Sequence, residues 1–385
     1  MYSTNFPIRQ FNAIPTPFYF YDLKLLDATL AEINSAAGEA GGDKFCVHYA
    51  VKANANPVVL NRIAQAGLGA DCVSMGEIIA ALSAGIDHSK IVFAGVGKTD
   101  EEIIQGLKAG IAAFNVESIP EIENIQRLAA REGTTAHIAI RVNPDIDAHT
   151  HHYITTGLAE NKFGIDRRAL PEVIKLVSDA ENLKLVGLHF HIGSQITDFT
   201  PFKILSERIN LLVDQLAAEG IELETINVGG GLGIDYDNPD ANPIPDFKLY
   251  FRTFADNLKL PAHIKVHFEL GRAVVAQCGS LITRVLYVKE GFEKKFVIVD
   301  AGMSDLIRPA LYEAYHAIEN ISNTDSATEQ TYDIAGPICE SSDVFGTDRS
   351  LPTVNRGNLL AIRSAGSYGE VMASHYNLRP LPPAV

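Results

Sequence analysis

Residues capable of covalent and acid–base chemistry stand at or near the ends of five short apolar runs. They are a lysine, an acid, a histidine, a run of glycines and a second acid: Lys52, Asp71, His191, Gly229–Gly231 and Glu269. Short apolar runs bounded by turn residues predict buried strands. The carboxyl ends of parallel strands in a barrel meet on one side. Together these positions would supply an amine, a ring partner, bare backbone amides and carboxylates, which a phosphorylated aldehyde cofactor needs.

Lys52 is the candidate nucleophile. The apolar run before it, Phe45–Val51, would desolvate the amine and favour the neutral form that attacks an aldehyde. The alternative is a lysine that only ends a strand and extends its ammonium to water. Since exposed lysines are the commoner kind, Lys52 alone does not decide the matter.

The glycine run Gly229–Gly233 offers amides that no side chain covers, which suits a phosphate at the start of a helix. The alternative is a tight turn between a strand and a helix. The place of the run after the seventh predicted strand favours the phosphate, because barrels bind phosphates at the loops after strands seven and eight.

Glu269 and two histidines complete the set. A carboxylate at Glu269 could keep a pyridine nitrogen protonated and make the ring an electron sink. The alternative is an ion pair with Arg272. His189 and His191 point to one face of a strand, where one ring could stack on a flat cofactor. They could instead be core histidines, and without further ligands at useful spacing we expect no metal.

Eight apolar runs alternate with amphipathic stretches before residue 270, which predicts a (β/α)₈ TIM-like barrel. Periodicity cannot show closure, so an open doubly wound sheet remains the alternative. The runs are Phe45–Val51, Ala70–Val73, Ile91–Ala94, Ala112–Val116, His137–Val142, Leu185–Ile192, Thr225–Val228 and Lys265–Glu269. Helix starts are indicated at Asn56-Pro57 and at Thr99–Glu102. The long insertion Asn143–Asp166 is of a length that is often functional.

After about residue 270 the pattern changes to short strands between turns, which predicts a β-rich second domain. We expect the barrel over residues 25–270 and the β-rich domain over residues 1–24 and 271–385. Its predicted elements are strands at Ser280–Val288, Phe296–Val299, Thr331–Ala335 and Asn358–Ile362, a helix within Ser304–His316, and an added strand at Phe18–Tyr21.

Composition limits the partners. The 385 residues carry a net charge of −15, which argues against nucleic acid or an anionic membrane as the main partner. No apolar run reaches the length of a membrane span, and no secretory signal is visible at the N-terminus. The four cysteines are far apart, as in reduced proteins of the cytoplasm. We therefore expect a cytoplasmic protein with a small-molecule substrate.

Motifs from about Phe18 to Asn377 resemble those of the diaminopimelate decarboxylase family. This family is part of a larger group of pyridoxal-phosphate-dependent decarboxylases with a barrel and a β domain, which includes ornithine and arginine decarboxylases. The motifs are Tyr49–Asn54, Arg141–Pro144 with Ala148–Thr150, Lys162–Gly164, His191–Gln195, Gly229–Gly231, Arg308–Tyr312, Gly336–Ser341 and Gly366–Gly369.

The resemblance implies roles around pyridoxal 5'-phosphate. Lys52 would bond to the cofactor aldehyde, His191 would stack on its ring, and Glu269 would pair with its pyridine nitrogen. Asp71 and Arg141 would steady the lysine and the ring. The phosphate would be held by Ser194, Gly229, Gly230, Gly231, Gly271, Arg272 and Tyr368.

The resemblance also implies how the substrate is bound. Its contacts would be Arg272, Arg308, Tyr312, Glu340 and Tyr368. Cys339 would donate the proton after decarboxylation, from a loop of the partner subunit, so the family implies a homodimer with shared active sites. For Cys339 the alternative is a small core thiol, and for Arg308 it is a structural cap on its segment.

The implied reaction is decarboxylation of meso-2,6-diaminopimelate to L-lysine and CO₂, in lysine biosynthesis. A planar guanidinium such as that of Arg308 suits a distal carboxylate, which ornithine lacks. Three alternatives remain. One is a decarboxylase of another amino acid, free, modified or carrier-bound. Another is a racemase, which Glu269 disfavours because alanine racemases place an arginine at the pyridine nitrogen. The third is a non-catalytic, cofactor-binding regulatory protein.

Overall fold

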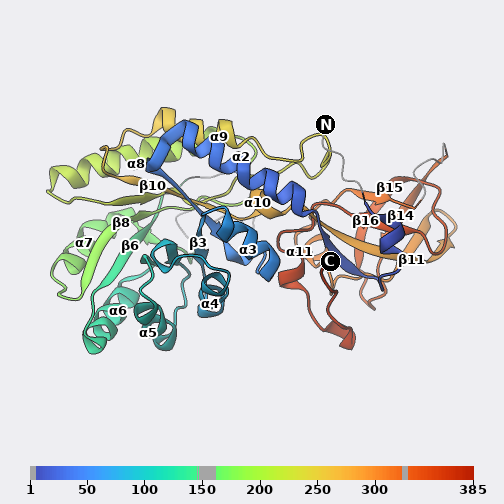
Figure 1. The fold of residues 1–385 in the computed structure, drawn as a ribbon, viewed down its shortest axis with the longest axis horizontal. Coiled ribbons are helices and arrows are strands. Elements are labelled where there is room, and N and C mark those ends of the chain that lie inside the picture. Colours follow the sequence, from blue (N-terminus) through green and yellow to red (C-terminus); the bar gives the residue numbers. More distant parts are fainter. Residues whose placement is uncertain (1–5, 145, 147–161, 323–327) are drawn as a thin grey trace. The chain divides into compact units, whose positions relative to one another are not determined.

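The chain divides into a barrel unit and a β unit. The barrel unit comprises Ala28–Gly233 and Asp246–Gly271, and the β unit comprises Met1–Asp27, Ile234–Pro245 and Arg272–Val385. The segment at 234–245 belongs with the β unit, although no motif in the sequence indicates this. The computed structural model in Figure 1 describes residues 6–144, 146, 162–322 and 328–385.

Eight parallel strands of the barrel unit close into a cylinder in the order β5-β4-β3-β2-β10-β9-β8-β6. Pairing of β5 with β6 joins the two ends of this series, so the predicted barrel is confirmed and the open sheet is excluded. Each predicted run overlaps one strand. The strands are β2 (Phe45–Ala50), β3 (Gly69–Cys72), β4 (Ile91–Phe93), β5 (Ala113–Val116), β6 (Ala136–Asn143), β8 (Leu183–His189), β9 (Thr225–Asn227) and β10 (Lys265–Leu270). A short β7 (Ile165–Asp166) pairs with the end of β6.

Helices alternate with these strands and lie outside them (Figure 1). No helix in the described parts of the chain is long and apolar enough to cross a bilayer. The helices are α2 (Leu23–Gly41), α3 (Pro57–Gln65), α4 (Met75–Ser83), α5 (Asp100–Ala109), α6 (Ile119–Glu132), α7 (Leu170–Ser178), α8 (Thr200–Ala218) and α9 (Phe247–Asn257).

The two helix starts expected from the sequence are present. The Asn56 side chain accepts a hydrogen bond from the amide of Val58 ahead of α3, with proline in its first turn. Thr99 and Glu102 form a reciprocal capping box at the start of α5. Such caps satisfy amides that have no partner within the helix, and they fix where each helix leaves the strand before it.

The β unit contains a seven-stranded mixed sheet in the order β13-β16-β11-β12-β14-β15, with β1 also paired to β11. The five predicted strands are present. The edge strand β15 and the three-residue β13 were not predicted. The helix predicted at Ser304–His316 is shorter in the structure, because α11 ends at Tyr312 and Glu313 follows it with a φ of 52°. The elements are α1 (Ile8–Phe11), β1 (Phe18–Tyr21), α10 (Arg272–Val275), β11 (Gly279–Glu290), β12 (Lys295–Val299), α11 (Arg308–Tyr312), β13 (Ile318–Asn320), β14 (Glu329–Ala335), β15 (Val344–Pro352) and β16 (Leu359–Ile362).

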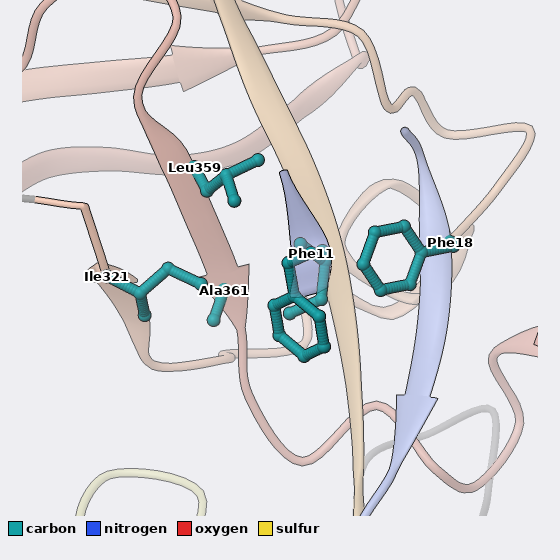
Figure 2. Packing of buried hydrophobic residues seen from close by; sticks show 6 residues of the cluster. Phe11, Phe18, Ile321, Leu359 and Ala361 are labelled. Atoms are coloured by element: carbon teal, nitrogen blue, oxygen red, sulfur yellow. The ribbon is translucent and has the colours of Figure 1, made fainter. Parts of the chain in front are cut away.

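An apolar cluster packs β1 against this sheet. Figure 2 shows Phe11, Phe18, Ile321, Leu359 and Ala361 in this cluster, and all five are buried. The rings of Phe11 and Phe18 meet edge to face with centroids 5.1 Å apart, a geometry that aromatic pairs prefer. Burial of this cluster explains why a four-residue strand near the N-terminus joins a sheet whose other strands follow residue 278.

Candidate active site

Lys52 lies in a single helical turn, Val51–Ala53, directly after β2. Its Nζ is 2.9 Å from Oδ2 of Asp71, which lies on the neighbouring strand β3. The Asp71 side chain is fully buried, whereas 38% of the Lys52 side chain is exposed. Burial raises the pKa of the Asp71 carboxyl and Glu269 adds to this, while Lys52 opposes it. The lysine is therefore held at the mouth of the barrel by an acid rather than extended freely into solvent.

Glu269, near the end of β10, is buried and held by three side chains. His189 Nε2 lies 3.1 Å from Oε2, and Asn227 donates to Oε1 at 2.7 Å. Asn115 donates to the same oxygen at 3.4 Å. Burial by itself would raise the pKa of Glu269, but His189, Lys52 and His191 together outweigh burial and hold this pKa well below its usual range. Glu269 is thus a carboxylate fixed by hydrogen bonds within the barrel unit.

His189 and His191 have different environments, although they are only two residues apart at the end of β8. The Gly230 amide donates to Nδ1 of His191 at 3.3 Å. Burial lowers the pKa of His191 to about 3, and Arg141 and Lys52 add to this effect. His191 is therefore a neutral ring with its hydrogen on Nε2, suited to stacking rather than to charge pairing. No group of three or more potential metal ligands occurs among the described histidines, cysteines and acids.

The glycine run after β9 forms a tight turn and also presents backbone amides, which the sequence analysis treated as alternatives. Gly229 has a φ of +71°, and a Cβ on Gly230 would lie 1.8 Å from the Glu269 carbonyl oxygen. The Gly229 amide donates to the Asn227 side chain at 2.9 Å, and the Gly230 amide to His191. No described residue accepts a hydrogen bond from the Gly231 amide, so this amide suits a phosphate oxygen.

We expect Gly230→Ala to destabilise the barrel unit, because its new methyl group must displace the end of β10. The expected loss in the free energy of unfolding is about 1–3 kcal/mol, measured by chemical denaturation. The matched control is Gly38→Ala, where a Cβ meets nothing within 4 Å and alanine favours the helix. If both variants were equally stable, the close approach at Gly230 would not constrain the fold.

Glu117 is a functional candidate that the sequence reading missed. It is buried directly after β5 and accepts a hydrogen bond from Arg141 at 3.0 Å. It also accepts from the amides of Gly95 and Gly164 at 3.1 Å each. The rule that singled out Lys52, a polar residue just after a buried strand, would have found it. Arg141 is thus held by an acid, with its guanidinium carbon 4.7 Å from the centroid of the Phe163 ring.

In the β unit, two buried arginines share one tyrosine. Arg272 Nη1 donates to the hydroxyl of Tyr236 at 2.6 Å, and Arg308 Nη2 donates to the same oxygen at 3.2 Å. The guanidinium of Arg272 lies 5.0 Å from the ring of Tyr368, and that of Arg308 lies 6.0 Å from the ring of Tyr312. The structure thus brings together four of the predicted substrate residues and adds Tyr236, which no motif had indicated.

No described carboxylate forms an ion pair with Arg308, although its side chain is only 6% exposed. Burial lowers the pKa of this guanidinium, an effect that nearby Tyr236 opposes. Because a buried cation needs a compensating partner, the cluster is suited to bind an anion such as a carboxylate or a phosphate.

The remaining predicted residues occupy turns. Ser194 and Gly271 lie in the bends that follow β8 and β10. Cys339 and Glu340 are exposed, and Glu340 accepts a hydrogen bond from Tyr376 at 2.7 Å. The exposure of Cys339 is at odds with a core thiol. The motif at 148–150 and most of the insertion at 143–166 lie outside the described residues.

Comparison with known proteins gives concordant matches over nearly the whole chain. Residues 28–276 match the model of the family described as "Pyridoxal-dependent decarboxylase, pyridoxal binding domain". The chain is 58% identical over 377 residues to a diaminopimelate decarboxylase of Bacteroides thetaiotaomicron, covering 98% of this chain and 97% of that protein. It is 48% identical to one of Neisseria meningitidis serogroup B, covering 95% and 86%.

A solved structure is also similar throughout. The crystal structure of diaminopimelate decarboxylase from Helicobacter pylori complexed with L-lysine matches with a TM-score of 0.91 at 42% identity. The match covers 98% of this chain and 93% of that chain. The likeness therefore extends over both the barrel unit and the β unit.

Proposed function

The chain belongs to the pyridoxal-dependent decarboxylases, and we propose that it converts meso-2,6-diaminopimelate to L-lysine and CO₂ with pyridoxal 5'-phosphate. The observation that carries the proposal is the set of Lys52, His191, Glu269 and the glycine run at one end of the barrel. High identity to several diaminopimelate decarboxylases supports the choice of substrate.

The barrel residues fit the cofactor group by group. The Gly231 amide, with Ser194 and Gly271, would receive the phosphate. The neutral ring of His191 would lie against the pyridine, and the fixed carboxylate of Glu269 would hold a proton on its nitrogen. When bound, the cofactor supplies an electron sink for the charge left on the α-carbon as CO₂ departs. Lys52, held by Asp71, would supply the amine for the cofactor aldehyde.

The β-unit residues fit the substrate. Diaminopimelate has a second amino-acid end, and its carboxylate matches the cluster in which no described acid pairs with Arg308. We assign Arg272 and Tyr368 to the phosphate as well, as the family resemblance suggests. Glu340 would contact the distal ammonium, and Cys339 would donate a proton to the α-carbon.

The test is a CO₂-release assay with purified protein, added pyridoxal 5'-phosphate and one amino acid at a time. We expect turnover of meso-diaminopimelate at least about 100-fold faster than that of ornithine or arginine. Neither of these has a distal carboxylate, so the buried arginine would be left without its partner. Preference for another amino acid would favour a sister decarboxylase. Cofactor binding without turnover of any substrate would favour the regulatory alternative.

We further propose a homodimer with shared active sites, located in the cytoplasm. The exposed turn with Cys339 and Glu340 lies beside Tyr376, which is 47% exposed, and Leu378, near it in the chain, is 96% exposed. An apolar surface of this kind is suited to a partner subunit. The four cysteines are free, as suits a reducing compartment.

Shared sites predict that two inactive variants restore activity in a mixed dimer. Lys52→Ala and Cys339→Ala, coexpressed with different tags and purified as the hybrid, leave one complete site if the two residues come from different subunits. Random pairing should give about a quarter of the wild-type activity, and the purified hybrid about half. Activity no higher than the mean of the two parents would show that both residues act within one subunit.

A further inference from the structure

His316 is a buried polar residue to which the proposed function gives no role. It follows α11 by four residues and is 0% exposed. Its Nδ1 lies 2.8 Å from the carbonyl oxygen of Arg363, and its Nε2 lies 3.3 Å from Nε of Arg308. The ring also meets that of Tyr236 edge on, with centroids 5.2 Å apart. His316 therefore packs against the same tyrosine that binds both arginines.

These two contacts determine the tautomer. A carbonyl oxygen only accepts and a guanidinium only donates, so the hydrogen is on Nδ1 and the lone pair is on Nε2. Burial lowers the pKa of His316 to about 3, and Arg308 adds to this. A neutral ring is what the geometry requires, because a protonated Nε2 would face the guanidinium as a like charge.

His316 and Tyr236 together fix the guanidinium of Arg308. Its five N–H donors lie in one plane, and the bonds from Nε and Nη2 use two of them. Two bonds from different nitrogens define the orientation of that plane. No described residue accepts a hydrogen bond from Nη1 or from the second Nη2 hydrogen. These hydrogens therefore remain for an anionic ligand and suit two parallel bonds with a carboxylate.

We propose that His316 is a positioning residue for substrate specificity, which accepts the Nε hydrogen of Arg308 and so orients this arginine toward the distal carboxylate of the substrate. The proposal rests on the proposed function, because that function assigns the carboxylate to Arg308. His316 acts only through Arg308 and contributes nothing to the reacting end of the substrate.

The test compares His316→Leu, which removes the acceptor, with His316→Gln, whose side-chain oxygen can replace it. We expect H316L to raise the KM for meso-diaminopimelate about 10- to 100-fold, as for loss of a hydrogen bond to a charged group. Its kcat should stay within about threefold of wild type, and H316Q should recover most of the KM. Unchanged KM, or a fall in kcat alone, would overturn the positioning role.

Two further measurements separate positioning from a general effect on folding. By calorimetry on the holoenzyme, H316L should weaken binding of L-lysine, which keeps a carboxylate, but not of 1,5-diaminopentane, which has none. In an Arg308→Ala background, H316L should raise KM no further, as a double-mutant cycle requires of coupled residues. Equal weakening of both ligands, or additive effects, would overturn the proposal. Wild-type protein that releases no CO₂ from meso-diaminopimelate would instead overturn the proposed function.

Discussion

Lys52→Ala should lower kcat at least about 1000-fold, because it removes the amine that would bond to the cofactor aldehyde. The loss should be catalytic rather than structural. The side chain is 38% exposed and contacts Asp71 at the barrel mouth, so we expect its removal to leave the fold intact. The measurements are CO₂ release and the thermal unfolding midpoint.

The control for this variant is Lys184→Ala. Lys184 is also a lysine on a barrel strand, but it lies in β8 near its amino end and pairs with the exposed Glu224. Its loss should leave kcat unchanged. If K52A turned over within tenfold of wild type, covalent attachment through Lys52 would be wrong, whatever the stability of the variant.

Glu269→Gln should lower kcat by about 100- to 1000-fold, the range seen when one preorganised electrostatic group is removed. The amide keeps the shape of the side chain but cannot hold a proton on the pyridine nitrogen, so the ring becomes a weaker electron sink. His189, Lys52 and His191 hold the pKa of Glu269 well below its usual range, so the contrast with a neutral amide should persist across the working pH range.

The paired control is Glu224→Gln, the same change at an exposed acid just before β9. It should alter neither kcat nor cofactor content, which absorbance in the visible region measures. If E269Q had full cofactor content and a kcat within threefold of wild type, the proposed role of Glu269 in the mechanism would be wrong.

Much of the barrel could be predicted because each strand overlaps a short apolar run, and several of these runs have a polar residue at or just after their end. Lys52 and Glu269 were found by this rule alone, and Asn227, the last residue of β9, could have been. The rule says nothing about partners, however. Asn227 and His189 bind Glu269 because their strands are close together in the closed sheet. The periodicity of apolar residues does not predict which strands become neighbours.

The β unit was harder to predict for two physical reasons. The edge strand β15 is half exposed and carries glycine, aspartate and arginine, so it lacks the apolar alternation of a buried strand. Tyr236 belongs to the β unit, although the chain on both sides of its segment, 234–245, belongs to the barrel unit. Its bond to Arg272 joins residues 36 positions apart, and only the folded chain reveals such a pairing.

The position of β1 has a consequence for the order in which the protein can fold during synthesis. β1 pairs with β11, and on its other side the amide of Tyr19 donates to the carbonyl of Pro383 at 2.8 Å. The ribosome therefore releases an aromatic strand whose partners appear only after the whole barrel has been made. Until then its unpaired edge is exposed to other chains, so nascent polypeptides should depend on chaperones most during this interval.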